Sequence, residues 1–321
     1  MLDKAKNETF APINAAYGQV FRPGRLTLGL VLTLDVFVVV ANFFLLGHIE
    51  AAQFAETLGF ASLWLRDVPF NVPSFGDPGQ IYDPFVYLGA LATATTRIAL
   101  GTSSIILPLR HPAHVAKAAA TADVLSGGRL LLGVASGDRP EEFPAMAQTY
   151  DDRGERFRES IAYMRAAGSG YPRHTGAHGT LSGNMDLLPK PTGARLPLLI
   201  TGGSQQAPDW VAQNGDGWMT YPRDVASQAR VVTDYRQRVS AAEQPNKPVM
   251  QSLYVDLMAE GNSQPSPIHL GFRSGTDFLR SYLRQIEALG INHVALNLRF
   301  NHRPINETLE HLARDVLPEF S

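Results

Sequence analysis

The stretch from Arg97 to Pro140 constrains the fold most strongly, because it reads as a strand, a helix and a second strand in succession. Residues 97–112 and 127–140 each carry an apolar run that does not alternate with polar residues, which is typical of strands buried on both faces. Residues 113–126 lie between them and are long enough to form a crossover helix. The stretch therefore predicts a βαβ unit in a parallel sheet.

The same order of strand and helix recurs along the whole chain. The other expected strands cover residues 26–32, 60–67, 196–201, 217–221, 248–258 and 291–300. The other expected helices cover residues 48–59, 84–95, 151–167, 204–214, 224–243, 276–290 and 305–317. Eight such units predict an α/β protein closed into a (β/α)8 TIM barrel. The alternative, an open doubly wound sheet, should carry G-x-G-x-x-G after its first strand, and the chain has no such motif.

No domain boundary is visible, so residues 1–321 are expected to form a single barrel domain with inserts after strands 4 and 7. Residues 1–25 read as an N-terminal arm that Pro12 and Pro23 interrupt. The first insert, residues 168–195, is expected to be irregular because it is rich in Gly and His. The second insert is the polar loop of residues 259–274.

Charge and cysteine content exclude several classes of protein. The formal net charge of the 321 residues is -2, which gives no electrostatic reason to expect nucleic acid or an anionic membrane as a partner. The chain contains no cysteine, so disulfides, thiolate metal sites and a cysteine nucleophile are excluded. The N-terminus mixes charges and lacks the apolar core of a signal peptide, and a cytoplasmic protein is expected.

One apolar segment, Leu30–Leu46, has about the minimum length of a membrane span. It contains Asp35 and Asn42, and a charge inside a span is costly. The segment is therefore interpreted as a buried first strand that runs into an apolar loop. Such a loop could favour an oily substrate or form a dimer surface.

Polar residues follow two of the apolar runs at the place where α/β proteins build their sites, the carboxyl ends of strands. Thr102, Ser103 and Ser104 end the first run, and Ser136 and Gly137 follow the second, with Asp138 next. These groups can hydrogen-bond a ligand. The alternative is that the Gly and Ser residues only permit tight turns.

A second candidate site lies between the expected strand 196–201 and the helix after it. Gly202 and Gly203 let backbone N–H groups approach an anion, and Ser204, Gln205 and Gln206 can donate further hydrogen bonds. With a helix N-terminus behind it, this turn predicts a phosphate cradle that needs neither metal nor lysine. An ordinary glycine-rich turn is the alternative.

Other chemistries find less support in the sequence. None of the five lysines lies clearly at the carboxyl end of a strand, which disfavours a Schiff-base aldolase. The pairs His111/His114 and His174/His178 lack carboxylate partners at ligand spacing, so no metal site is expected. A glycosidase pair of carboxylates remains a minor alternative.

Four segments taken in order resemble the bacterial luciferase-like flavin monooxygenases. They are GFASLWLRD, RIALGTSSIILPLRHP, DVLSGGRLLLGVASGDRPEEF and LPLLITGGSQQ with NGDGW, and the resemblance runs from about residue 26 to the C-terminus. It implies a barrel that binds FMN, or a deazaflavin in some branches, at the carboxyl ends of its strands. Family members receive reduced flavin, bind O2 and insert one oxygen atom into an organic substrate.

Carried over residue by residue, the resemblance assigns flavin-phosphate contacts to Gly203, Ser204 and Gln206, with Gly202 beside them. It places Thr102, Ser103 and Ser104 under the isoalloxazine, where the family often has a bulge or a cis peptide. It places Ser136 and Gly137 in the lining of the flavin pocket.

Arg66 and Asp67 occupy the end of the second strand, where family members place a His or Cys that acts on substrate or flavin. This chain has neither residue there. Arg66 and Asp67 are therefore the candidate catalytic residues, Arg66 as a group that stabilises a developing anion. The alternative is that the two only pair with each other.

The sequence thus predicts an FMN-dependent monooxygenase that acts on a small organic substrate with O2. A separate flavin reductase and a homodimer are also expected. The first rival is a deazaflavin enzyme that transfers hydride without oxygen chemistry. The second is a flavin-binding barrel without catalytic activity, which the missing His or Cys after the second strand keeps open.

Overall fold

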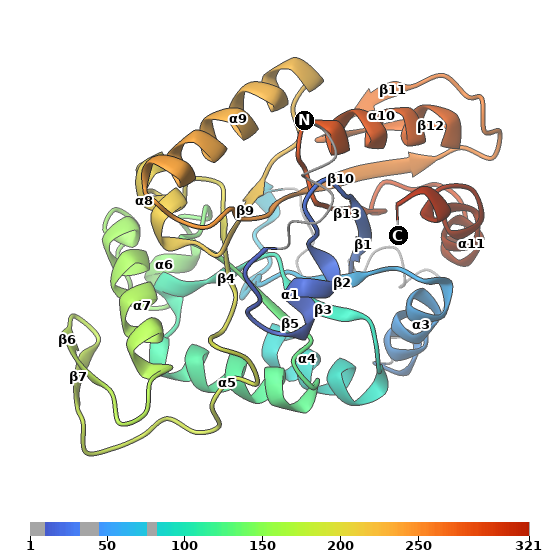
Figure 1. The fold of residues 1–321 in the computed structure, drawn as a ribbon. Helices are drawn as coiled ribbons and strands as arrows, with labels where there is room; N and C mark the ends of the chain where they lie inside the picture. The colour runs from blue at the N-terminus through green and yellow to red at the C-terminus, as the bar shows by residue number, and fades with distance from the viewer. Residues whose placement is uncertain (1–9, 33–44, 76–81, 321) are drawn as a thin grey trace.

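The computed structural model describes residues 10–32, 45–75 and 82–320, and it closes eight parallel strands into a barrel (Figure 1). Each strand pairs with the next in chain order, and β13 pairs with β1 to complete the ring. The predicted (β/α)8 TIM barrel is confirmed. The barrel strands are β1 (Thr27–Val31), β2 (Ser62–Leu65), β3 (Ala99–Thr102), β5 (Leu130–Ala135), β8 (Leu198–Thr201), β9 (Gly217–Thr220), β10 (Val249–Leu257) and β13 (His293–Asn297).

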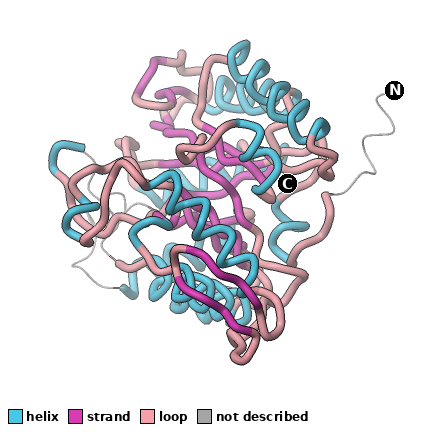
Figure 2. The backbone as a smooth tube through the Cα atoms, turned by 90° about the vertical axis from the view of Figure 1, so that its left-hand side faces the viewer, coloured by secondary structure: helices cyan, strands magenta, loops and turns pink. Residues whose placement is uncertain are grey.

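A ring of helices covers the outside of these strands, and Figure 2 shows the strands in magenta inside the cyan helices. Asp83 begins one of them as predicted, because its carboxylate accepts from the N–H groups of Phe85 and Val86 and Pro84 occupies the first turn. The covering helices are α3 (Leu45–Leu58), α4 (Pro84–Ala94), α5 (Pro112–Leu125), α7 (Arg153–Ala167), α8 (Pro208–Asn214), α9 (Val225–Ala241), α10 (Thr276–Ala288) and α11 (Ile305–Asp315).

Alternate residues of the buried strands face two different cores. Leu28 and Leu30 point outward into the layer between strands and helices, whereas Val31 and Trp64 belong to a cluster inside the barrel. The barrel interior is tightly filled. A Cβ on Gly29 would collide with Ser62 Oγ, so a larger residue cannot occupy that position without moving β2.

The N-terminal segment is more than the arm predicted for residues 1–25. Residues 15–20 form helix α1 (Ala15–Val20), which lies across the ring of strands in Figure 1. Tyr17, Val20 and Phe21 are buried with Trp64 and Leu131 of the barrel interior. The segment therefore closes the N-terminal end of the barrel, because its apolar side chains complete the inner core.

Both inserts contain strands that the sequence analysis assigned to loops. The first carries the antiparallel hairpin of β6 (Arg173–Gly176) and β7 (Gly179–Ser182). In the second, β11 (Ser266–Ile268) and β12 (Gly271–Ser274) form a hairpin, and β12 pairs in parallel with β10. These strands are short and polar, so they lacked the apolar runs by which buried strands were identified.

Two other expectations concern the apolar segment and the helix after β8. Most of Leu30–Leu46 lies outside the described residues, so the expected loop over residues 36–46 is not tested. Within the described parts, no helix has the length and apolar character needed to cross a membrane. Helix α8 begins at Pro208 rather than at residue 204, because residues 202–206 form turns.

Candidate active site

A cavity of about 700 Å³ opens at the carboxyl ends of the barrel strands. Its wall contains nine of the eleven residues that the sequence analysis singled out; Thr102 and Gln206 lie outside it. The chain thus gathers residues up to 138 positions apart, from Arg66 to Ser204, around one space. The nine residues are Arg66, Asp67, Ser103, Ser104, Ser136, Gly137, Gly202, Gly203 and Ser204.

The turn after β8 presents backbone N–H groups to this cavity. Gly202, Ser204 and Gln205 have φ angles of 55°, 44° and 59°, so the turn alternates into the left-handed region. Within the described parts of the chain, the N–H groups of Gly203, Ser204 and Gln205 have no acceptor. Successive N–H groups in such a turn form an anion-binding concavity. The turn can therefore hold a phosphate.

Side chains brace this turn from outside the cavity. Ser204 Oγ donates to Thr201 O at 2.7 Å, and Gln206 Nε2 donates to Gly154 O at 2.6 Å. The amide of Gln206 therefore ties the turn to the first turn of α7 instead of facing a ligand. Gln205, to which the family resemblance assigned no flavin contact, lines the cavity instead. The backbone N–H groups available to a phosphate belong to the turn and not to a helix N-terminus, because α8 starts four residues after Ser204.

The end of β3 forms another side of the cavity. Thr102 is buried and its hydroxyl donates to Gly133 O at 2.8 Å, so its side chain joins β3 to β5. The peptide bond between Ser103 and Ser104 is cis, and the short strand β4 (Ile105–Ile106) follows it. The hydroxyls of Ser104 and Thr201 are in hydrogen-bond contact, which joins this side to the phosphate turn.

Asp67 is held by Arg110, which bears on the alternative that Arg66 and Asp67 only pair with each other. The Asp67 carboxylate accepts from Arg110 Nη2 at 2.8 Å, from Arg110 Nε at 3.0 Å and from Ile106 N at 3.0 Å. Arg110 also contacts Asp83 at 3.0 Å. With its oxygens so engaged, Asp67 fixes the ends of β2 and β4 beside the cavity.

Arg66 and Asp138 also act electrostatically on Tyr221, which lines the cavity after β9. Burial raises the pKa of the Tyr221 hydroxyl, the charge of Asp138 raises the pKa further, and the charge of Arg66 lowers it. The Tyr221 hydroxyl is therefore a neutral donor at neutral pH. The guanidinium of Arg66, the carboxylate of Asp138 and the hydroxyl of Tyr221 therefore lie on the same side of the cavity.

Sequence reasoning missed the cavity residues near β10 and β13, among them the four with rings or a positive charge, Tyr254, His269, Arg299 and Phe300. His269 is the one histidine that the described residues contribute to the cavity wall. Two of the four follow the end of β13, so the same rule that selected polar residues after strands 3 and 4 applied to Arg299 as well. His269 had no such signal, because it lies in an insert.

The histidine pairs considered as metal ligands have structural roles. His111 caps α5, since its Nδ1 accepts from Ala113 N at 3.2 Å, and its Nε2 donates to His178 O at 3.2 Å. In the described ranges, no group of three or more His, Cys, Asp or Glu side chains is arranged to hold a metal.

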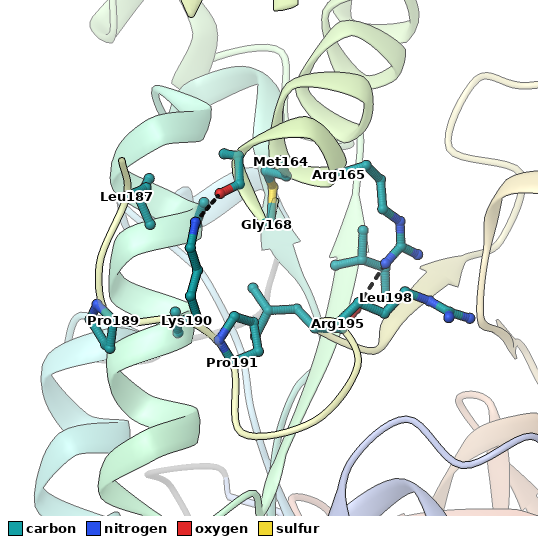
Figure 3. A pocket seen from close by; sticks show the side chains of 13 residues that line it. Met164, Arg165, Gly168, Leu187, Pro189, Lys190, Pro191, Arg195 and Leu198 are labelled. Carbon is teal, nitrogen blue, oxygen red and sulfur yellow. Dashed lines mark hydrogen bonds between the residues drawn. The ribbon is translucent and has the colours of Figure 1, made fainter. Parts of the chain in front are cut away.

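A smaller pocket lies between α5, α7 and the segment before β8 (Figure 3). Its volume of about 30 Å³ holds about one water molecule. Lys190 beside it donates to Ser169 O at 2.5 Å and pairs with Asp186. This pocket is too small for an organic ligand.

Sequence comparisons agree with the geometry of the cavity. The luciferase-like monooxygenase family matches residues 44–262. An uncharacterised protein of Mycobacterium tuberculosis is 33% identical over 191 residues, covering 54% of this chain and 67% of that protein. An F420-dependent hydroxymycolic acid dehydrogenase of the same species is 28% identical over 195 residues, covering 60% and 53%. The oxygenase component of the flavin-dependent trigonelline monooxygenase of Acinetobacter baylyi is 30% identical over 169 residues, covering 51% and 42%.

Solved structures share the fold across nearly the whole chain. The monooxygenase RslO1 from Streptomyces bottropensis superimposes with a TM-score of 0.76 at 20% identity, covering 92% of this chain and all of that one. An F420-dependent secondary alcohol dehydrogenase superimposes with a TM-score of 0.75 at 16% identity, covering 92% and 99%. The family match covers more than half of the chain. The chain therefore belongs to the luciferase-like monooxygenase family of oxidoreductase enzymes.

Proposed function

We propose that this enzyme is an FMN-dependent monooxygenase that uses reduced flavin and O2 to oxygenate a small organic substrate. The observation that carries the proposal is the turn of Gly203, Ser204 and Gln205, which lines the cavity and whose three N–H groups have no acceptor among the described residues. A phosphate dianion fits that donor set, because charge-assisted hydrogen bonds to an anion are stronger than neutral ones.

The remaining walls suit a flat ring system attached to that phosphate. Ser103 and Ser104 line one side, Ser136 and Gly137 line the end of β5, and Arg66 lies at the end of β2. When bound, reduced FMN supplies two electrons, and one atom of O2 enters the substrate while the other leaves as water. Arg66 offers a positive charge that stabilises an anion developing in the cavity.

The deazaflavin reading stays as a second candidate function, because a relative that matches 60% of this chain is named an F420-dependent dehydrogenase. FMN is preferred here because the relative named a flavin-dependent monooxygenase is the slightly more identical of the two, at 30% against 28%. The rival of a flavin-binding barrel without activity conflicts with membership of an enzyme family.

The test combines FMN binding with oxygen uptake. The purified protein is titrated with FMN and then supplied with NADH, a flavin reductase and a panel of organic acids and ketones. We expect saturable FMN binding and oxygen uptake above the reductase background with at least one substrate. If the protein instead reduces a substrate anaerobically with reduced F420 and shows no substrate-dependent oxygen uptake, it is a deazaflavin-dependent enzyme.

A separate reductase is part of the proposal, because the relative from Acinetobacter is named an oxygenase component. We expect NADH alone to bleach bound FMN only slowly. Rapid and saturable anaerobic reduction by NADH or NADPH without a reductase would make the chain self-sufficient. A homodimer and a cytoplasmic location remain predictions, which light scattering and cell fractionation test.

A further inference from the structure

Four residues form a wall of the cavity that the phosphate turn does not reach. Tyr254 comes from β10, His269 from the tip of the β11–β12 hairpin, and Arg299 and Phe300 from the segment after β13. Round the barrel, β10 lies two strands and β13 three strands from β8, which carries the phosphate turn. We call these four residues the aromatic wall.

The rings of the aromatic wall contact one another in a row. The centroid of Tyr254 lies 5.7 Å from that of His269 and 5.1 Å from that of Phe300. The guanidinium carbon of Arg299 lies 5.4 Å from the centroid of Phe300. These distances are typical of aromatic pairs and of a cation over a ring. The wall therefore offers ring surface with positive and polar groups at its edge.

Strand pairing holds the wall in place. Along β10, Ser252 and Tyr254 line the cavity, whereas Leu253 and Val255 are buried in the layer under the helices. Tyr254 N donates to Leu270 O at 3.2 Å, which fixes the hairpin tip beside the Tyr254 ring. Arg299 N donates to Asn297 Oδ1 at 3.1 Å. The fold therefore presents these side chains from paired backbone and not from free loops.

The charges around the cavity are distributed unevenly. Its acidic lining residues, Asp67 and Asp138, belong to the ends of β2 and β5, and Asp67 is paired with Arg110. The acid of β10, Asp256, is only 2% exposed and is held by His302 Nδ1 at 2.7 Å and Arg273 Nε at 3.3 Å. On the side of the aromatic wall the described lining residues thus supply hydrogen-bond donors and positive charge, and no carboxylate.

We propose that the aromatic wall binds a planar aromatic carboxylate, and that this is the substrate class of the enzyme. The ring lies against Tyr254 and Phe300, and the carboxylate accepts from Arg299 and His269. Ring contacts favour a flat aromatic body over a puckered one, and a guanidinium favours a carboxylate. That the bound acid is a substrate rests on the proposed function, whereas its binding to the wall does not.

The test compares two acids of equal charge, benzoate and cyclohexanecarboxylate, by calorimetric titration of the protein with and without added FMN. We expect benzoate to bind at least tenfold more tightly. Tyr254→Leu should weaken benzoate at least fivefold and leave cyclohexanecarboxylate within twofold. Phe300→Leu gives the same comparison if the first variant does not fold. Arg299→Gln should weaken both acids at least fivefold.

The matched control is Phe272→Leu. Phe272 lies on the same hairpin, but its ring contacts Phe278 and Tyr282 and does not line the cavity. This control should leave the affinity for benzoate within twofold. Equal losses in Phe272→Leu and Tyr254→Leu would show that only hairpin packing matters, and would overturn the proposal.

Two further outcomes separate the wall from the flavin site. Equal affinity for the two acids, or competition of benzoate with FMN, would overturn the proposal, since competition would assign the wall to the flavin ring. If the wild-type protein binds benzoate through Tyr254 but does not bind FMN, the proposed function fails and the aromatic wall stands.

Discussion

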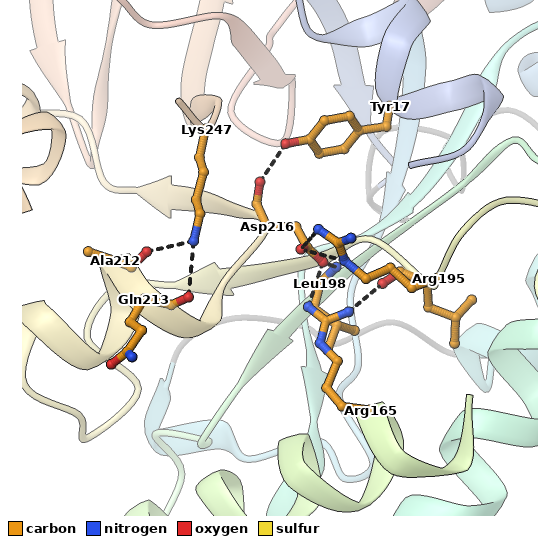
Figure 4. A network of polar contacts seen from close by, with 9 residues as sticks. Tyr17, Arg165, Arg195, Leu198, Ala212, Gln213, Asp216 and Lys247 are labelled. Atoms are coloured by element: carbon orange, nitrogen blue, oxygen red, sulfur yellow. Dashed lines mark hydrogen bonds and ion pairs between the residues drawn. The ribbon is translucent and has the colours of Figure 1, made fainter. Parts of the chain in front are cut away.

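The two ends of the barrel use their polar groups in opposite ways. At the N-terminal end, Asp216 accepts from Arg165, Arg195 and the N–H of Leu198, and Tyr17 donates to the Asp216 carbonyl (Figure 4). At the carboxyl end, the turn of residues 203–205 leaves N–H groups without acceptors among the described residues. At the N-terminal end the polar groups bond one another and stabilise the fold, whereas at the carboxyl end the N–H groups of the turn can bind a ligand.

The closed end also contains a buried histidine, His293. His293 is fully buried at the start of β13; its Nδ1 contacts Thr27 Oγ1 at 2.7 Å and its Nε2 contacts Ser62 Oγ at 2.8 Å. Trp64 Nε1 donates to Ser62 Oγ at 2.7 Å. Burial favours the neutral form of the ring, and the hydrogen bonds fix its position. The comparison therefore predicts that substitutions at this end change stability, while those at the cavity end change binding.

The largest expected effect is at Asp216. Asp216→Ala removes a carboxylate that is 5% exposed and leaves Arg165 Nη2 and the N–H of Leu198 without their acceptor. Breaking such a pair costs about 3 kcal/mol of unfolding free energy. Urea unfolding should show this loss, whereas the affinity for FMN under native conditions should be unchanged.

The control for Asp216 is Asp209→Ala. Asp209 pairs with Arg238 at 2.6 Å, but its side chain is 79% exposed, and such surface pairs contribute less than about 1 kcal/mol. Equal losses at Asp209 and Asp216 would contradict the special role given to the closed end.

The next effect is the pH dependence of stability through His293. Burial lowers the pKa of His293 to about 3, below the value of about 6.5 in the unfolded chain. The unfolded state therefore takes up the proton first, so the stability that depends on neutral His293 is complete above about pH 6.5 and is lost as the pH falls toward 3. Each pH unit in that window costs about 1.4 kcal/mol.

The measurement is the unfolding free energy between pH 7 and pH 5 for the wild type and for His293→Gln. The wild type should lose about 2 kcal/mol more than the variant over this range. Comparing slopes removes the contributions of other histidines and any loss of stability common to all pH values. Parallel slopes would show that His293 is not neutral in the folded protein.

At the cavity end, Gly203→Asp should reduce binding without reducing stability. A Cβ at Gly203 meets no heavy atom nearer than 3.7 Å, so the side chain fits, but its charge repels a phosphate. The affinity for FMN should fall at least tenfold, about 1.4 kcal/mol, with an unfolding free energy within about 1 kcal/mol of the wild type. Gly203→Asn has nearly the same size without the charge and should keep most of the affinity. FMN titration and urea unfolding check both variants, and an unchanged FMN affinity in Gly203→Asp would move the phosphate elsewhere.

The sequence predicted the architecture because its strands are buried on both faces and therefore appear as unbroken apolar runs. The same rule could not find the β11–β12 hairpin, whose strands are short and polar. It also could not find the burial of the N-terminal segment, because its apolar side chains are buried only by contact with the barrel interior. Turn chemistry predicted Gly203 and Ser204 on the cavity wall. It could not tell Gln205 from Gln206, because which amide faces inward depends on positive φ angles at Ser204 and Gln205.

The partner of Asp67 shows the same limit for ion pairs. Arg66 is its neighbour in sequence, yet Arg110, 43 positions away, donates to both oxygens of the Asp67 carboxylate. Tertiary pairings of this kind follow from the closure of the barrel and have no local signal. The fold and nine of the candidate residues on the cavity wall were therefore predictable, whereas the pairing of side chains was not.

The smallest expected effect separates backbone from side chain within the phosphate turn. Ser204 has a φ of 44°, which glycine adopts freely and alanine does not. Ser204→Gly removes the hydroxyl that donates to Thr201 O but keeps the turn accessible, so we expect the affinity for FMN to stay within about threefold, since that hydroxyl bond contributes only about 1 kcal/mol or less. Ser204→Ala removes the same hydroxyl and also disfavours the turn by about 1 kcal/mol, so both its affinity and its unfolding free energy should be lower than those of Ser204→Gly. FMN titration and urea unfolding of the two variants side by side measure the difference. If both variants lose the same affinity, the Ser204 hydroxyl and not the row of N–H groups holds the phosphate. The carboxyl end of the barrel would then bind its ligand through a side chain and not through free backbone donors.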